Sequence, residues 1–143
     1  HNTVEQVQRM VDYVRKRAAG RVQFQFVNEK PEMIAPLSPP LFDWVIENLL
    51  KNALDAMDGN GSITVTMKEE TDRILIDVMD TGKGIVRENI SKVFKPGFTT
   101  KKRGWGLGLS LSKRIVEQYH KGKLFVKHSE PGKGTTFRLE LKK

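Results

Sequence analysis

The fold is decided by residues 40–57, which read PLFDWVIENLLKNALDAM. Ser38 and the prolines after it can begin a helix here, because a serine hydroxyl caps free N–H groups and proline suits the first turn. Asp58-Gly59-Asn60-Gly61 is a typical helix end. We therefore predict a long helix from about Pro40 to Met57. Its buried stripe is expected to hold Leu41, Val45, Leu49, Ala53 and Ala56, widened by Ile46, Leu50 and Met57.

Two amides interrupt this apolar surface. Asn48 and Asn52 are one turn apart and face the same way. Burying an amide without a partner costs about 1–3 kcal/mol, so both need partners or contact with water. A carbonyl oxygen is a suitable ligand for Mg²⁺, which completes its shell with waters and nucleotide phosphates. The helix alone leaves a metal site and a solvated edge equally open.

The rest of the chain alternates strands with helices, joined by hairpin-length turns. This order predicts an α+β fold, a two-layer α/β sandwich with a mixed, mostly antiparallel sheet covered on one face by helices. Residues 28–39 carry three prolines and are expected to form a connector with a short edge strand. Helices are expected at Val4–Arg17, Arg87–Phe94 and Gly108–Tyr119, and strands at Val22–Phe26, Ser62–Lys68, Arg73–Met79, Lys123–His128 and Thr135–Leu141.

The composition restricts the class of protein. At 143 residues the chain is long enough for one domain with its own core, and the absence of cysteine excludes disulfides and thiolate metal sites. No apolar run reaches the roughly 20 residues that span a bilayer. We expect a soluble, cytoplasmic piece of a longer protein, which leaves a membrane anchor elsewhere in that protein open. The net charge of +8 suggests nucleic acid, but aromatic residues do not alternate with the scattered cations, so nucleic acid is not expected.

Two glycine-bearing stretches carry further chemistry. Residues 80–85, DTGKGI, follow an expected strand, where an aspartate can accept a hydrogen bond from an amino group such as that of adenine. The alternative is an ordinary tight turn that starts with aspartate. Residues 97–110, GFTTKKRGWGLGLS, match neither common phosphate loop but place glycines before a helix start, where free N–H groups attract anions. By itself this stretch is either a surface loop or a phosphate-binding device.

In combination, the stretches resemble the catalytic, ATP-binding domain of sensor histidine kinases. That domain is part of the GHKL superfamily, with type II topoisomerases, heat-shock chaperone ATPases and mismatch-repair ATPases. The resemblance covers about Val22 to Leu141 and implies a Bergerat-type ATP-binding fold. The matching motifs are the N box Glu47–Ala56, the first glycine box Asp80–Gly84, the F box Phe94–Lys101, the second glycine box Gly104–Leu109 and the threonine motif Gly134–Phe137.

The resemblance implies a site for ATP and Mg²⁺. Asn52 would coordinate Mg²⁺, and Asn48 would support the phosphates or the waters of the ion. Asp80 would bind the adenine amino group, with Gly84 and Thr135 around the base. The implied catalytic residues are Asn48, Asn52 and Lys101, and the implied nucleotide-binding residues are Asn48, Asn52, Asp80, Gly82, Gly84, Ile85, Lys101, Gly104, Gly106, Leu107, Gly108, Leu109 and Thr135.

The same resemblance makes residues 95–106 the ATP lid. Lys101 and Arg103 would add charge at the phosphates, and Phe94 and Phe98 would anchor the lid, with ordinary core packing as the alternative for both. The sequence departs from the usual family pattern at Asp55, Ala56, Gly97 and Trp105, which leaves contacts at those positions open.

Position 48 separates two kinds of chemistry. The ATPases of the superfamily place a glutamate four residues before the metal-binding asparagine, as a general base for water. Here that residue is Asn48, and Glu47 points about 100° away around the helix, where we expect it to be solvated or salt-bridged. The sequence therefore favours phosphoryl transfer to a protein side chain over hydrolysis.

We predict an ATP-dependent protein-histidine kinase fragment whose acceptor histidine lies on a separate domain. None of His1, His120 and His128 has a helical acceptor context, and the last two are expected to be structural or surface residues. Residues 1–19 are interpreted as a residual helix and linker from the dimerisation and phosphoacceptor domain, and residues 20–143 as the catalytic domain. Expected partners are that domain and a downstream response regulator, in a homodimeric full-length protein. The alternatives are a serine kinase of the anti-sigma-factor type and a non-catalytic nucleotide-binding module.

Overall fold

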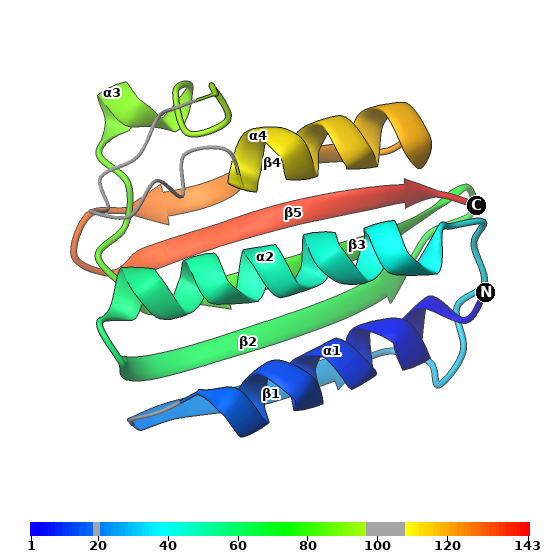
Figure 1. Cartoon of the computed structure of the whole chain (residues 1–143), viewed down its shortest axis with the longest axis horizontal. Coiled ribbons are helices and arrows are strands. Elements are labelled where there is room, and N and C mark those ends of the chain that lie inside the picture. Colours follow the sequence, from blue (N-terminus) through cyan, green and yellow to red (C-terminus); the bar gives the residue numbers. More distant parts are fainter. Residues whose placement is uncertain (19–20, 97–107) are drawn as a thin grey trace.

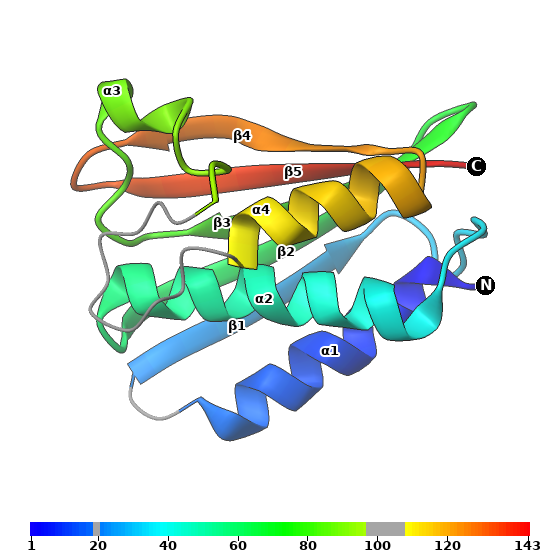
Figure 2. The ribbon, with the colours of Figure 1, turned by 45° about the horizontal axis from the view of Figure 1, so that its top comes forward.

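The computed structural model describes residues 1–18, 21–96 and 108–143. Within these ranges five strands form one sheet, and α1, α2 and α4 lie on the same side of it (Figures 1 and 2). The helices are α1 (Thr3–Arg17), α2 (Pro39–Met57), α3 (Arg87–Ile90) and α4 (Gly108–Arg114), which continues as a π-helical segment, Ile115–Tyr119. The strands are β1 (Arg21–Asn28), β2 (Asn60–Glu69), β3 (Arg73–Asp80), β4 (Lys123–Glu130) and β5 (Gly134–Lys142).

The strand order in the sheet is β1-β2-β3-β5-β4. Only β1 and β2 run parallel, which requires a crossover between them, and α2 supplies it. The other neighbouring strands pair antiparallel. The predicted α+β sandwich, with a mixed and mostly antiparallel sheet covered on one face, is therefore confirmed.

The core lies between the sheet and the helices. Strand side chains alternate between the two faces, and the residues of β2 and β3 that face the helices, such as Val65 and Ile76, are buried. The buried stripe of α2 differs slightly from the prediction, because Leu41 and Ala56 are only half-buried, whereas Phe42 is buried at 1% exposure. Phe42 packs edge-on against the ring of His120, with 6.2 Å between centroids. The buried residues of α2 are Phe42, Val45, Ile46, Leu49, Leu50, Ala53 and Met57.

The first turn of α2 is held in a way that the sequence did not predict. Ser38 is the N-cap residue, but its side chain makes no capping hydrogen bond, so the expected hydroxyl cap is wrong. Its backbone N–H instead donates to Nε2 of His120 at 3.0 Å, and Nδ1 of that ring lies 3.2 Å from the carbonyl oxygen of Ile115. His120 is buried and His128 is exposed, which confirms them as a structural and a surface residue.

Helix α1 shares the core with α2. Its apolar residues, including Val7 and Val11, are buried in the same cluster, and Thr3 Oγ1 donates to the carbonyl oxygen of Met33 at 2.7 Å. The proline-rich connector forms only an isolated bridge between Asn2 and Ile34, so the short edge strand expected there is wrong. The assignment of residues 1–19 to a preceding domain stays a prediction.

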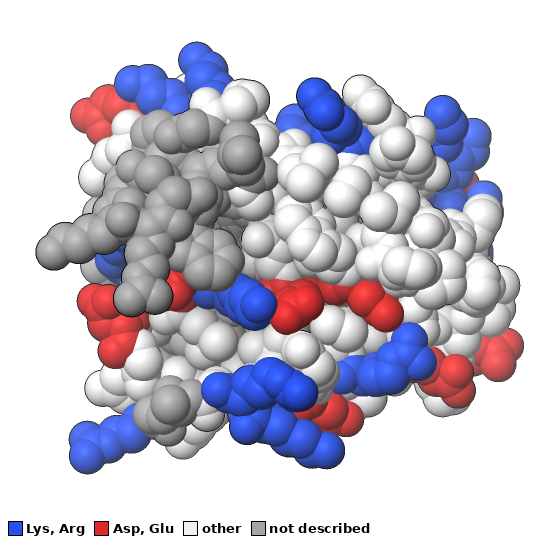
Figure 3. All heavy atoms as spheres, in the orientation of Figure 1, with Lys and Arg blue, Asp and Glu red and all other residues white. Residues whose placement is uncertain are grey.

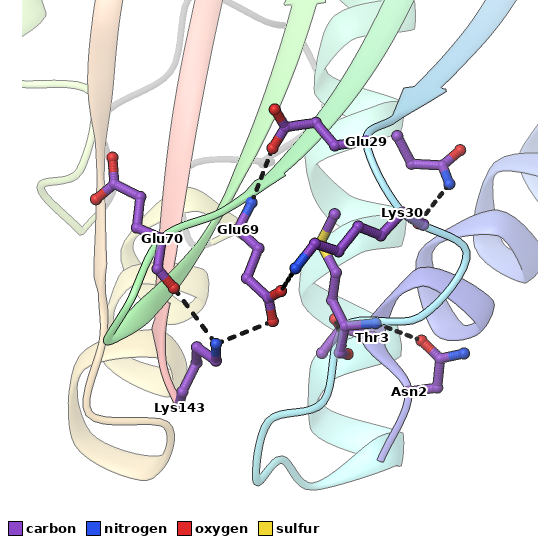
Figure 4. A network of polar contacts seen from close by, with 9 residues as sticks. Asn2, Thr3, Glu29, Lys30, Glu69, Glu70 and Lys143 are labelled. Carbon is purple, nitrogen blue, oxygen red and sulfur yellow. Dashed lines mark hydrogen bonds and ion pairs between the residues drawn. The ribbon is translucent and has the colours of Figure 1, made fainter.

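A network of ion pairs joins the strand ends on the side of the molecule where both termini lie (Figures 1 and 4). The Glu69 carboxylate accepts from Nζ of Lys30 at 2.6 Å and from Nζ of Lys143 at 3.0 Å. The backbone N–H of Lys143 donates to the carbonyl oxygen of Asp72 at 3.1 Å. These contacts attach the end of β5 to the β2–β3 turn. Of the described helices, none is both long and apolar enough to cross a membrane.

Candidate nucleotide-binding site

A buried carboxylate and a buried hydroxyl lie side by side where β3 ends and β5 begins. Asp80, 3% exposed, is paired directly with Thr135, 4% exposed, in the antiparallel register of these strands. Both belong to the face of the sheet that the helices cover, because each is in phase with the buried residues of its strand. Oδ1 of Asp80 accepts the backbone N–H of Gly82 at 2.9 Å, which orients the carboxyl group.

The loop of residues 81–85, which follows Asp80, is attached to three neighbouring segments. These are the start of β2, the end of α2 and the turn between β4 and β5 (Figure 2). Contacts with these neighbours therefore hold the loop, together with the turn in which Asp80 accepts the N–H of Gly82. The bonds run from Thr81 N to Ser62 O (3.2 Å), Ser62 N to Thr81 Oγ1 (3.0 Å), Lys83 N to Ala56 O (2.9 Å) and Gly132 N to Lys83 O (2.7 Å).

The glycines of this loop have a packing requirement. A Cβ on Gly82 would lie 2.5 Å from the carbonyl oxygen of Ala56. Gly84 has φ +73° and a Cβ there would lie 2.2 Å from the carbonyl oxygen of Glu130. Both glycines therefore allow backbone segments to approach one another, a reason that the sequence did not reveal. Close approach of a base to these glycines stays a prediction.

Ser129 is a site residue that the sequence analysis missed. Its Oγ accepts the backbone N–H of Ile85 at 2.8 Å and lies 2.8 Å from Oγ1 of Thr135. The alternation along β4 would place His128, not Ser129, on the side of Val126. An irregularity between Val126 and His128 shifts the register by one residue, so periodicity could not find this side chain.

The second cluster joins α2 to α4. Nδ2 of half-buried Asn48 donates to Oγ of Ser112, which is fully buried. A Cβ on Gly108, the first residue of α4, would lie 2.7 Å from Oδ1 of Asn48. Asn48 is therefore held between two helices. Asn52 is half-buried one turn further along α2, and the half-buried Leu109 packs against the core.

Two residues beside this cluster have ordinary structural contacts. Glu47 forms a salt bridge with Lys51 at 3.0 Å, as expected. Phe94 packs edge-to-face on Phe137 with 6.0 Å between centroids, and Nζ of Lys113 lies 4.7 Å from the Phe94 ring centre. Core packing therefore accounts for Phe94.

Several predicted residues cannot be placed. Within the described ranges, no group of three or more His, Cys, Asp or Glu side chains is arranged to hold a metal ion. The role of Asn52 as a ligand for Mg²⁺, which commonly takes few ligands from the protein, stays a prediction. Asp55 is exposed and Ala56 is half-buried at the end of α2. Outside the described residues lie Gly97, Phe98, Lys101, Arg103, Gly104, Trp105, Gly106 and Leu107.

The fold and these two clusters define a two-layer α+β domain of the Bergerat type. The chain belongs to the family described as histidine kinase-, DNA gyrase B-, and HSP90-like ATPases, which matches residues 38–143. The family membership that the motifs predicted is thus confirmed.

The relatives of the chain are sensor and sporulation kinases. It is 40% identical to sensor histidine kinase ZraS of Salmonella typhi over 84% of this chain and 26% of that protein. It is 37% identical to sporulation kinase E of Bacillus subtilis over 85% of this chain and 16% of that protein. The chain thus spans about a quarter or less of these relatives.

A solved structure resembles the whole chain. The catalytic domain of histidine kinase ThkA aligns with a TM-score of 0.84 and 28% identity, covering 100% of this chain and 94% of that one. ThkA has also been solved in complex with the response regulator protein TrrA, where the TM-score is 0.82, the identity is 27%, and the alignment covers 41% of that chain.

Proposed function

We propose that this chain is the ATP-binding catalytic domain of a sensor histidine kinase. It transfers the γ-phosphoryl group of ATP to a histidine on a separate domain. The observation that carries the proposal is the buried pair of Asp80 and Thr135 beside the glycine-bearing loop. A carboxylate has several acceptor sites, so Asp80 can bind the N–H of Gly82 and also accept from a ligand, which is consistent with a binding role.

The part of the proposed site that holds adenine, here called the base end, consists of Asp80, Thr135 and the loop after β3. There the carboxylate of Asp80 accepts a hydrogen bond from the adenine amino group, and the hydroxyl of Thr135 donates to the neighbouring ring nitrogen. The backbone of Gly82, Gly84 and Ile85 forms the wall beside the base. Hydrogen bonds in such a buried position are electrostatically stronger than in water. The bonds that attach the loop to its neighbours hold these groups in place before the nucleotide arrives.

At the phosphate end, the amide oxygen of Asn52 would be the protein ligand for Mg²⁺, and Asn48 would support the phosphates or the ion's waters. Mg²⁺ would neutralise charge on the phosphates. The side chain of Lys101 and the backbone N–H groups of Gly104, Gly106, Leu107, Gly108 and Leu109 would contact the phosphates, as the family resemblance implies. Phosphoryl transfer depends mainly on such positioning and electrostatic stabilisation.

The contacts of position 48 favour transfer over hydrolysis. Asn48 has no basic group, and its amide N–H₂ is engaged by Ser112. The neighbouring Glu47 is paired with Lys51 and is therefore not directed at a water molecule between Asn48 and Asn52. The acceptor is a side chain of the preceding dimerisation and phosphoacceptor domain.

The full-length protein is a homodimer that passes the phosphoryl group to a response regulator, and this chain lies on the cytoplasmic side. The ThkA–TrrA complex and the relatives named as sensor histidine kinases support the response regulator as a partner.

The test is transfer of label from [γ-³²P]ATP, with Mg²⁺, to the separately produced phosphoacceptor domain of the same protein. We expect an acid-labile, base-stable phosphohistidine, lost in Asn52→Ala. Asn28→Ala is the matched control, because that side chain bonds the carbonyl oxygen of Lys30 at the other end of the sheet. An acid-stable label would support the serine-kinase alternative. Nucleotide binding without label would support a non-catalytic module.

A further inference from the structure

The hydroxyl group of Ser129 contacts both the loop that follows β3 and the start of β5. Ser129 lies on the face of β4 that the helices cover, directly opposite Thr135 in the pairing with β5. Its Oγ accepts the N–H of Ile85 at 2.8 Å, lies 2.8 Å from Thr135 Oγ1 and lies 3.4 Å from the carbonyl oxygen of Gly134.

Either hydroxyl could donate in the bond between Ser129 and Thr135, and the other partners of Ser129 bear on which of them does. A serine hydroxyl has one proton, and its oxygen already accepts the N–H of Ile85. Of its two remaining partners, Thr135 is at an ordinary O–H···O distance and Gly134 is at the limit of one. The shorter distance favours donation from Ser129 to Thr135 over donation to Gly134, and in that arrangement the proton of Thr135 is left for another acceptor.

We propose that Ser129 is a positioning residue that fixes the Thr135 hydroxyl as a donor and so contributes to selection of adenine over guanine. The inference rests on the proposed function, because it assumes that a purine lies against Asp80 and Thr135. The acceptor carboxylate and the donor hydroxyl then form a two-point pattern at neighbouring strand ends.

Adenine and guanine present opposite patterns to these two groups. Adenine has an amino donor next to a ring-nitrogen acceptor, which matches Asp80 and a donating Thr135. Guanine has a carbonyl acceptor next to an N–H donor. Its carbonyl would face the acceptor Asp80, and its N–H would face the donating hydroxyl of Thr135. Without Ser129 the threonine hydroxyl can rotate and accept from guanine, while Asp80 still rejects the guanine carbonyl. Loss of Ser129 should therefore lower the discrimination without abolishing it.

The test is calorimetric titration of the 143-residue chain, with Mg²⁺, using AMPPNP and GMPPNP. We expect Ser129→Ala to weaken AMPPNP binding about threefold to tenfold, the equivalent of one hydrogen bond, and to weaken GMPPNP binding less. In a Thr135→Val background the same change should cost less than about twofold, because coupled residues are not additive. Ser129→Thr should restore the adenine preference, and Ser91→Ala, an exposed serine on the C-cap of α3, is the matched control.

The inference would be overturned if Ser129→Ala weakened binding of AMPPNP and GMPPNP equally. It would also be overturned if this change weakened AMPPNP binding equally in the wild-type and Thr135→Val backgrounds. If Ser129→Ala fails to fold by circular dichroism, Thr135→Val alone decides, since an unchanged adenine-to-guanine ratio in that variant also overturns it. A folded wild-type chain that binds neither nucleotide would remove the proposed function itself. Wild-type binding with no effect of Ser129 would remove only the role of this serine.

Discussion

The two ends of the proposed nucleotide site are built from different kinds of contact. At the base end, the register of β3, β5 and β4 positions Asp80, Thr135 and Ser129. Backbone hydrogen bonds attach the loop of residues 81–85 to the segments around it. At the phosphate end, the described contact is a hydrogen bond between two side chains, Asn48 on α2 and Ser112 on α4.

This difference has a consequence for function. Strand pairing fixes a side chain through many backbone bonds at once, whereas a bond between two helices holds only while the helices keep their places. We therefore expect substitutions that disturb the backbone at the base end to affect folding and binding together. Substitutions at the phosphate end should affect binding and transfer more than the stability of the fold.

The largest effect is expected for Gly84→Ala. This residue has φ +73° and its Cβ would lie 2.2 Å from a backbone oxygen. Strain and overpacking together should lower the free energy of unfolding by about 3–5 kcal/mol, measured by urea denaturation. Gly132→Ala is the matched control, because its φ is +81° but nothing lies within 4 Å, so only about 1 kcal/mol should be lost. Equal losses in both variants would mean that the loop is not fixed by its neighbours.

The second-largest effect on the free energy of unfolding is expected for His120→Leu, at the C-terminal end of the helix that begins at Gly108. His120→Leu removes the acceptor for the N–H of Ser38 and the partner of the Ile115 carbonyl oxygen. Because these groups lose hydrogen bonds at a buried position, the free energy of unfolding should fall by about 2–4 kcal/mol. His128→Leu, on the exposed part of β4, should change it by less than about 0.5 kcal/mol in the same experiment. A similar small change in both would show that His120 does not join α2 to the end of this helix.

Gly108→Ala tests the phosphate end directly. The new Cβ would lie 2.7 Å from Oδ1 of Asn48, the end of a side chain that can move. The gain in helix propensity, about 1 kcal/mol, offsets part of the contact, so the unfolding free energy should change little. Displacing the Asn48 amide should weaken AMPPNP binding about tenfold by calorimetry, the loss of one good hydrogen bond. A loss of stability comparable with that of Gly84→Ala, with unchanged affinity, would contradict the difference between the two ends.

The smallest effect is expected for a substitution of Asp77, on the face of the sheet that the helices do not cover and away from the proposed nucleotide site. Burial alone would raise the pKa of Asp77, but the paired guanidinium of Arg138, at 2.8 and 2.9 Å, and the nearby Lys127 outweigh it and leave the pKa lowered. A lowered folded-state pKa stabilises the fold above the unfolded value, about 3.9, and this contribution is lost as the pH falls through the folded value.

Asp77→Asn should therefore cost about 1 kcal/mol at pH 7, and the difference from wild type should shrink below about pH 4. Urea denaturation across this pH range measures it, and AMPPNP affinity at pH 7 should stay unchanged. Asp12→Asn removes an exposed pair with Arg15 and keeps an oxygen that can accept from Nε2 of Gln8, so it should cost less than about 0.5 kcal/mol. A pH-independent difference for Asp77 would mean that its charge does not matter.

Local patterns in the sequence were sufficient for the layout of the fold and for much of the site. Helical spacing located α2 and placed Asn48 and Asn52 on one face, and the end of an alternating run located Asp80. Contacts between distant segments were not accessible in this way. The irregularity in β4 moved Ser129 into the site, and the ring of His120 replaced the expected cap at Ser38. The packing of Gly84 against Glu130 likewise depends on how two loops meet.

The most direct test of the nucleotide site is calorimetric titration of the chain with AMPPNP, with and without Mg²⁺, for wild type and Asp80→Asn. The asparagine oxygen can still accept from Gly82, so the loop should stay folded while the acceptor for the adenine amino group is lost. We expect micromolar binding by the wild type, strengthened by Mg²⁺ and abolished in Asp80→Asn. A folded wild-type chain that binds no AMPPNP, or an Asp80→Asn variant that binds as tightly as wild type, would contradict this assignment.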